Sequence, residues 1–336
     1  MTSSPADLVL PWQQTQWEQL RAAHRAQRLP QALLISGIPG VGKGDFARAL
    51  AASLLCSSPG GDGQPCGRCQ GCHLLEVGNH PDYRRLQPEE PSKVIKIDMI
   101  REFTRGENLT AQAGGYKLVI IEPADAMNQA AANALLKTLE EPVPWTLMLL
   151  VTSAPGRLPA TIRSRCQKLQ IEVPDRRLAS QWLVDQGVRG DPDLLLALAS
   201  GAPIKALELA TEETLASRIK LLGEFAAILA QREDPVTVAA RWSKLDLGRL
   251  LNWYSGWLID CLRLKADSGA RDLINPDQRK RLQAIGNRIE FDELYRLLDE
   301  AYGIIRNLGT PLNPQMTLEG MLLTLSASIV GKGKPD

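Results

Sequence analysis

The sequence has almost no net charge and no long apolar run. Its 39 basic and 38 acidic side chains leave a formal charge of +1, so no overall basic field would draw nucleic acid to the isolated chain. No apolar stretch approaches the roughly 18 residues that a membrane-spanning helix needs. The N-terminal segment also lacks the basic stretch and apolar core of a secretory signal peptide. We therefore expect a cytoplasmic protein that does not contact membranes and that meets DNA only within a complex.

The apolar pattern changes along the chain, whose 336 residues are too many for one compact core. Short apolar runs typical of buried parallel strands lie at 32–36, 118–121, 147–151 and 169–173. Helices are predicted at 12–29, 44–55 and 128–141. This alternation predicts an α/β domain with a parallel sheet flanked by helices. From about residue 175 the strand signals end, and the pattern predicts short helices to residue 210 and longer ones beyond.

A glycine-rich loop joins the first predicted strand to a helix. Its residues Gly37, Gly40, Gly42 and Lys43 match the phosphate-binding pattern Gly-x4-Gly-Lys. A working loop continues with Ser or Thr, whose hydroxyl holds Mg²⁺, but Gly44 stands there without a side chain. The backbone amides and Lys43 can still meet phosphate oxygens at the helix N-terminus. The pattern favours a degenerate phosphate loop over a plain glycine turn.

The second half of an ATP-hydrolysing site is also altered. After an apolar strand such a site carries Asp-Glu, where Asp holds the metal and Glu polarises the attacking water. Here Glu122 and Pro123 follow the strand, and proline cannot act as a base. Two independent defects in one reaction predict that this chain does not hydrolyse Mg²⁺-bound ATP. The alternative that Glu122 is a strand-end carboxylate with no role stays open.

Four of the six cysteines fall within 17 residues, at Cys56, Cys66, Cys69 and Cys72. Two-residue gaps allow neighbouring thiolates to converge on one tetrahedral ion, and four sulfurs form a closed structural zinc site. Catalytic zinc is disfavoured because no open-site His/Glu pattern occurs. Redox switching by Cys66 and Cys69 is the alternative, and the lack of a thioredoxin-like setting disfavours it. The spacing therefore predicts structural Zn²⁺ in a module at about 56–72.

Several motifs together resemble the clamp-loader branch of the AAA+ ATPases. The segments at 116–128 and 131–142 are similar to that family's second ATP-site motif (Walker B) and the helix after it. The run Ser164, Arg165, Cys166 is similar to its Ser-Arg-Cys motif. Residues 311–314 with 318–319 resemble its C-terminal helical domain. The resemblance covers residues 1–210 well, and the four-cysteine module also matches one found in bacterial clamp loaders.

The resemblance implies an AAA+ architecture of three parts. These are a nucleotide-binding-like domain at 1–174 with the zinc-module insertion, a small helical lid at 175–210, and an all-α C-terminal collar for oligomerisation at 211–336. Within the family, the departures at Gly44 and Glu122-Pro123 point to a non-motor subunit rather than to the ATPase subunits called gamma and tau.

The resemblance also implies roles for individual residues. Arg165 is expected to be an arginine finger, which presents its guanidinium to a nucleotide held by a neighbouring subunit; a structural salt bridge is the alternative. Thr152 and Ser153 resemble the family's first sensor of the γ-phosphate, and Lys205 resembles its second. Both sensors are equally well explained as structural residues, since no γ-phosphate is expected to be handled here.

The implied function is to help load the sliding clamp on primed DNA during replication. The implied partners are gamma/tau and delta subunits in a five-subunit ring, with the clamp and DNA met through the complex. Polymerase activity is then expected only for the holoenzyme. Two alternatives remain: an active ATPase that uses Lys43 with an unusual metal site, and a zinc-ribbon protein that binds nucleic acid alone.

Overall fold

The computed structural model describes residues 9–89, 93–104, 111, 115–308 and 312–328. The predicted motif residue Pro311 lies outside the described residues. The chain divides into two compact units, Met1–Leu178 and Ala179–Asp336, and each is described by itself. No helix in the described ranges is both long and apolar enough to cross a bilayer.

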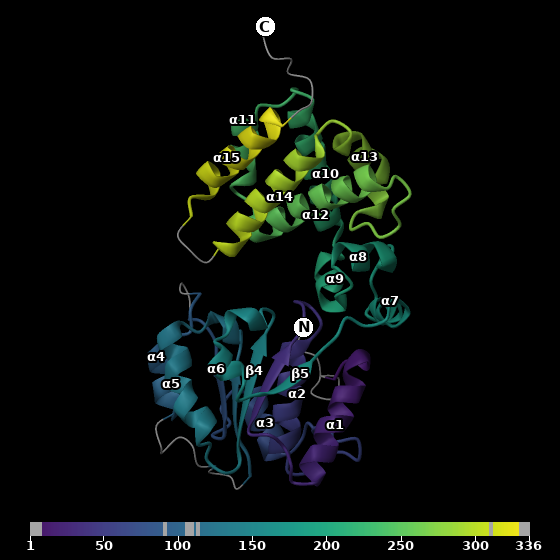
Figure 1. The fold of residues 1–336 in the computed structure, drawn as a ribbon. Helices are drawn as coiled ribbons and strands as arrows, with labels where there is room; N and C mark the ends of the chain where they lie inside the picture. Colours follow the sequence, from purple (N-terminus) through teal and green to yellow (C-terminus); the bar gives the residue numbers. More distant parts are fainter. Residues whose placement is uncertain (1–8, 90–92, 105–110, 112–114, 309–311, 329–336) are drawn as a thin grey trace. The chain divides into compact units, whose positions relative to one another are not determined.

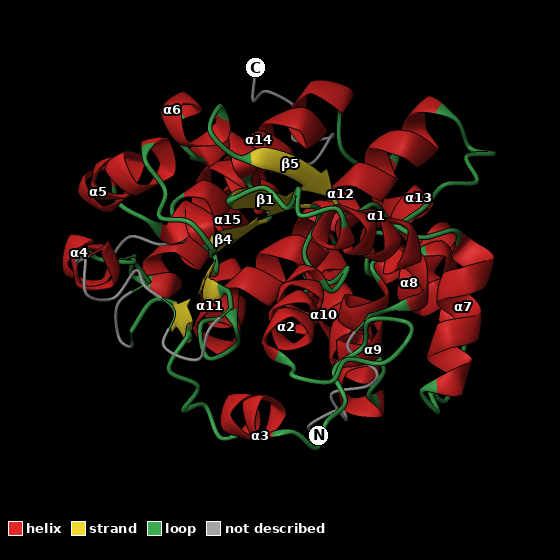
Figure 2. Ribbon diagram, turned by 90° about the horizontal axis from the view of Figure 1, so that it is seen from below, coloured by secondary structure: helices red, strands yellow, loops and turns green. Residues whose placement is uncertain are grey.

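The first unit is built on a five-stranded sheet in which every strand pair is parallel. The strands lie in the order β2-β3-β4-β1-β5 and span β1 (Ala32–Ser36), β2 (Tyr83–Leu86), β3 (Lys117–Ile121), β4 (Thr146–Thr152) and β5 (Gln167–Gln170). The central strands β1, β3 and β4 are almost entirely buried, as their apolar runs predict. Figure 2 draws the strands in yellow and labels β1, β4 and β5. The predicted parallel sheet flanked by helices is confirmed.

Helices cover both faces of this sheet (Figure 1). They are α1 (Gln14–Arg25), α2 (Lys43–Leu55), α3 (Gln70–Glu76), α4 (Ile97–Thr104), α5 (Gln129–Glu140) and α6 (Ala160–Arg163). On one face, Val119 and Ile121 of β3 pack with Ile100 of α4 and Leu135 of α5 in one buried cluster. Leu118 and the other alternate residues of β3 point to the opposite face, because side chains alternate along a strand. Each central strand therefore contributes to two apolar layers.

The second unit is helical throughout its described residues. It contains α7 (Arg176–Asp185), which begins in the first unit, α8 (Pro192–Leu198), α9 (Pro203–Leu209), α10 (Glu212–Leu229), α11 (Pro235–Trp242), α12 (Leu247–Ala266), α13 (Arg279–Gly286), α14 (Phe291–Arg306) and α15 (Pro314–Ala327). The buried residues between 179 and 209 form one hydrophobic cluster, and those between 221 and 325 form another. The predicted all-helical C-terminal region is confirmed, while its division into lid and collar stays a prediction.

Candidate functional site

Parallel pairing brings three predicted site segments to one edge of the sheet. Ser36, the last residue of β1, pairs in register with Thr152 at the end of β4, and β3 ends next to β4 at Ile121. The glycine loop at 37–42 follows β1, and Glu122 follows β3. Since the carboxyl ends of parallel strands meet at one edge, the loop, Glu122 and Thr152 lie together there.

Glu122 reaches the glycine that replaces the metal-binding hydroxyl. A Cβ built on Gly44 would lie 2.1 Å from Oε1 of Glu122, so the carboxylate takes up the space that a Ser or Thr side chain needs. The other oxygen, Oε2, pairs with Arg85 Nη2 at 2.9 Å and lies 3.5 Å from Arg48 Nη1. Gly44 and Glu122, one from each half of the predicted site, thus form one local arrangement, in which a paired carboxylate lies against a bare backbone.

Lys43 is directed into its own loop. It is buried, and its Nζ donates a hydrogen bond to the Ile38 carbonyl at 2.7 Å. Burial lowers the pKa of Lys43, while the nearby carboxylates of Glu122 and Asp125 act in the opposite direction. The ammonium is therefore engaged by the backbone of its own loop.

The N-terminal segment fixes the same loop from outside. Trp12 Nε1 and Gln13 Nε2 each donate to the Val41 carbonyl at 3.0 Å, and Gln13 also donates to the Gly42 carbonyl at 2.9 Å. Gln13 is fully buried, and Gly42 has a φ of 81°, a left-handed conformation that favours glycine. Sequence reasoning missed both donors, because they lie 28 or 29 residues from their acceptors and carry no local motif.

The first sensor-like residue is turned toward the helix turn after β3. Thr152 is buried, and its Oγ1 donates to Asp125 Oδ1 at 2.5 Å while accepting from the Ala154 amide at 3.0 Å. Ser153 is exposed. The structure gives Thr152 a local structural role, and the sensor assignments of Thr152 and Ser153 stay predictions.

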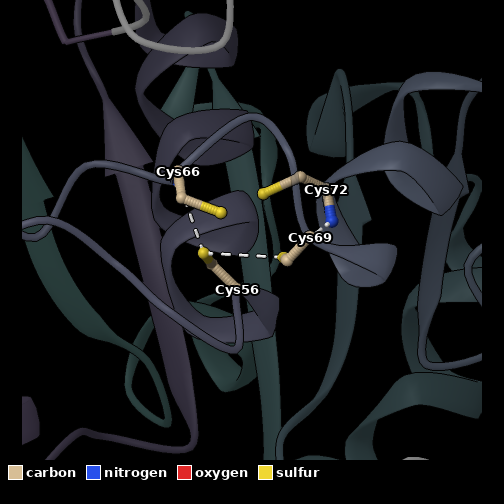
Figure 3. Close-up of side chains that lie close together, drawn as sticks. All are labelled: Cys56, Cys66, Cys69 and Cys72. Carbon is tan, nitrogen blue, oxygen red and sulfur yellow. Dashed lines mark hydrogen bonds between the residues drawn. The ribbon is translucent and has the colours of Figure 1, made fainter.

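The four cysteines converge at the start and end of the predicted module. Their sulfur atoms all lie within 4.8 Å of one another, and Figure 3 shows the four side chains directed toward a common centre. Cys69 Sγ is 3.8 Å from Cys56 Sγ. A tetrahedral ion with Zn–S bonds of about 2.3 Å would hold its sulfurs roughly 3.8 Å apart, which is the Cys69–Cys56 separation, so the four cysteines could hold such an ion.

Backbone amides and burial have opposite effects on the pKa values of these cysteine thiols. The amides of Ser58 and Cys66 point at Cys56 Sγ, at 3.4 and 3.3 Å. Burial acts against the thiolate of Cys69, but surrounding N–H groups, first that of Cys72, outweigh it and lower the pKa of Cys69 to about 5. Burial raises the pKa of Cys72 to about 12. A metal ion would therefore have to displace protons from this cluster on binding.

Arg165 lies at the opposite edge of the sheet from the glycine loop. It follows α6 and directly precedes Cys166 and β5, which runs parallel to β1. The start of β5 therefore marks the amino edge of the sheet, whereas the glycine loop follows the carboxyl end of β1. The five residues of β1 separate these edges by about 15 Å at the usual rise of a strand. Arg165 is thus placed away from the phosphate loop of its own chain.

Two acceptors hold the Arg165 side chain. Nη2 pairs with Glu140 Oε1 at 2.6 Å, and Nη1 donates to the Thr161 carbonyl at 3.0 Å. The side chain is still 35% exposed. Ser164 is exposed as well, whereas burial raises the pKa of Cys166 to about 11 and keeps it a thiol. Of this motif, the cysteine belongs to the core and the arginine faces solvent.

Family models and known sequences agree on the relationship. A model described as "DNA polymerase III, delta subunit" matches residues 12–175, and one described as "DNA polymerase III, delta subunit, C terminal" matches residues 212–327. The delta-prime subunit of Pseudomonas aeruginosa DNA polymerase III is 38% identical over 284 residues, which cover 83% of this chain and 85% of the relative. That of Escherichia coli is 34% identical over 319 residues, 94% of each chain. The chain belongs to the delta-prime family.

A shorter likeness links this member of the delta-prime family to a second kind of subunit. The tau/gamma subunit of Haemophilus influenzae DNA polymerase III is 36% identical over 156 residues, which cover 46% of this chain and 22% of that protein. The resemblance predicted from the motifs is therefore confirmed at the level of the family.

The remaining predicted site residue lies in the second unit. Lys205, on α9, lines a cavity of about 510 Å³ together with residues of α8, α12 and α14. Its assignment as a second sensor in this delta-prime family member stays a prediction. Sequence reasoning also missed Arg48, Arg85 and Glu140, whose partners are distant or lie in another element, so no local pattern could have found them.

Proposed function

We propose that the chain is a non-motor subunit of the DNA polymerase III clamp loader and helps load the sliding clamp on primed DNA. Its membership in the delta-prime family is the observation that carries this proposal. The partners would be gamma/tau and delta subunits in a five-subunit ring, and the clamp and DNA would be met through that complex. A role in DNA replication also agrees with a cytoplasmic location.

The chain's own ATP site is proposed to be inactive. Hydrolysis needs a hydroxyl and an aspartate for the metal and a base for the water. Gly44 provides no hydroxyl, Pro123 no base, and Glu122 is already paired with two arginines. No catalytic residue in cis is therefore assigned, and polymerase activity would belong to the holoenzyme alone.

Arg165 is proposed to act in trans on ATP held by a neighbouring subunit. Its position at the edge opposite the glycine loop favours this over action on its own site. Its charge is permanent, and its partly exposed N–H groups suit phosphate oxygens. This gives a chain with a broken site a part in the ATP cycle of the complex.

The four cysteines are proposed to hold one structural zinc ion. Their sulfur spacing supports four-sulfur coordination, and a closed site of this kind leaves no position for a substrate. The loop at 57–64 has few apolar residues, and Trp17, Arg21 and Ser53 hold its backbone carbonyls by hydrogen bonds. Zinc would also hold the two ends of the loop together, because Cys56 precedes it and the other three cysteines follow it.

The lid at 175–210 and the collar at 211–336 are proposed as separate parts. The two hydrophobic clusters of the second unit support a division near residue 211.

Reconstitution tests the overall proposal. Clamp loading on primed DNA should be measured with purified gamma/tau, delta and clamp, with and without this chain. We expect assembly and loading to require it. Full loading in its absence, or no association with gamma/tau and delta, would contradict the proposal.

A further inference from the structure

Two contacts within the described residues hold the guanidinium of Arg165, whose side chain is 35% exposed. The pair with Glu140 uses Nη2, and the hydrogen bond to the Thr161 carbonyl uses Nη1. Arginine carries five N–H groups, so these two contacts leave three that can reach another acceptor. The plane of the guanidinium is therefore fixed from two sides while a set of donors stays available.

Glu140 stands where a carboxylate is unfavourable on local grounds. It is the last residue of α5, and the C-terminal end of a helix carries partial negative charge that repels anions. The same end favours a cation, and Arg165 supplies one at 2.6 Å. The helix dipole does not favour a glutamate here, whereas a role in holding Arg165 accounts for one.

We propose that Glu140 is a positioning residue for Arg165. With Thr161 it would hold the guanidinium in one orientation before a neighbouring nucleotide arrives, so that less side-chain freedom is lost when the phosphate is bound. A single contact from Glu140 orients the arginine without occupying the donors that a phosphate needs. This inference rests on the proposed role of Arg165 as a finger in trans.

The test uses the complete reconstituted clamp loader and its DNA-stimulated ATP turnover. The turnover lost in Arg165→Ala defines the part that depends on the finger. We expect Glu140→Gln to remove about nine-tenths of that part, a tenfold loss, because small misplacement of a catalytic group is costly. The KM for ATP should change little, and Glu140→Asp should restore part of the loss.

Glu141→Gln is the matched control. It changes the next residue, which is exposed and for which no ion pair is found in the described part of the chain, and it should leave turnover unchanged. Size-exclusion chromatography should show that every variant assembles. In the Arg165→Ala background, Glu140→Gln should have no further effect, because the two residues would act through one contact.

The outcomes separate this inference from the finger assignment. If Arg165→Ala lowers turnover but Glu140→Gln leaves it unchanged or raises it, the positioning role is wrong and the finger stands. The same holds if Glu140→Gln acts equally with and without Arg165. If Arg165→Ala itself changes nothing, the finger assignment and this inference both fail.

Discussion

The carboxylate of Glu122 fills the space that a side chain at position 44 would need. A Cβ on residue 44 would meet Oε1 at 2.1 Å, while Arg48 and Arg85 hold Oε2 on the other side. A serine at position 44 would therefore require the flexible carboxylate of Glu122 to shift, which would alter its contacts with Arg48 and Arg85.

Gly44→Ser should leave the isolated chain without ATP turnover. The serine restores the hydroxyl, but Glu122 still stands where an active site carries the metal-binding aspartate, and Pro123 still provides no base. Turnover can be followed by phosphate release in the presence of Mg²⁺. Turnover that rises clearly above that of the unsubstituted chain would show that Gly44 alone had disabled the site.

Cys69→Ser should abolish zinc binding. Loss of one thiolate opens a four-sulfur site and removes the ligand whose pKa is lowered to about 5. We expect about one zinc ion per chain in the unsubstituted protein and little in the variant, measured by atomic spectroscopy after dialysis. Cys261→Ala is the control, because that thiol is buried in the second unit.

Zinc retained by Cys69→Ser, or lost equally in Cys261→Ala, would exclude the proposed ligand set.

At the scale of elements, one buried carboxylate joins α12 to the chain that follows it. Asp260 is fully buried and accepts from the amide of Ile274 at 2.9 Å and from the amide and side chain of Asn275 at 2.7 and 2.9 Å. Asn275 in turn accepts from buried Arg218 on α10 at 2.7 Å. The irregular segment before α13 is thus fixed by polar contacts inside an apolar core.

Asp260→Ala should destabilise the protein by about 3 kcal/mol, because it leaves three donors, two of them buried, without their acceptor. Asp299→Ala, which removes an exposed carboxylate of α14, should change stability little. Urea unfolding followed by circular dichroism measures both. Equal midpoints for the two variants would mean that Asp260 is not important for this packing.

The elements predicted best are those whose own residues decide their environment. The strand at 32–36 is found at the predicted residues, since a run that is buried on both faces must be apolar throughout. Edge strands give a weaker signal. β2 was missed because Arg84 and Arg85 are exposed there, and the strand predicted at 169–173 is found at Gln167–Gln170, where only Leu169 is buried.

The candidate site divides in the same way. The cysteine cluster was predicted from spacing, because its ligands lie close together along the chain and their sulfurs converge. The approach of Glu122 to Gly44 and the pairing of Arg165 with Glu140 depend on how β3, α2, α5 and α6 pack, so residue spacing could not reveal them.

At the scale of the molecule, the sheet of the first unit has two edges that carry different residues. The carboxyl edge carries the glycine loop, where Lys43 donates to the Ile38 carbonyl and the Glu122 carboxylate lies against Gly44. The amino edge carries Arg165, which is partly exposed and held by Glu140. A subunit of this kind would not hydrolyse ATP itself. It would allow its neighbour to hydrolyse ATP only when the two subunits are assembled.

One comparison within the reconstituted clamp loader tests this most directly. DNA-stimulated ATP turnover should be measured for complexes that carry Lys43→Met or Arg165→Ala in this chain, with assembly checked for each. We predict that Lys43→Met leaves turnover unchanged, because we propose that the chain's own site does not hydrolyse ATP. Arg165→Ala should remove the part of the ATP turnover that the neighbouring subunit's site contributes, since arginine fingers raise the rate roughly 10³-fold or more in related reactions. The reverse pattern, with loss in Lys43→Met and none in Arg165→Ala, would contradict the account and identify the chain as a motor.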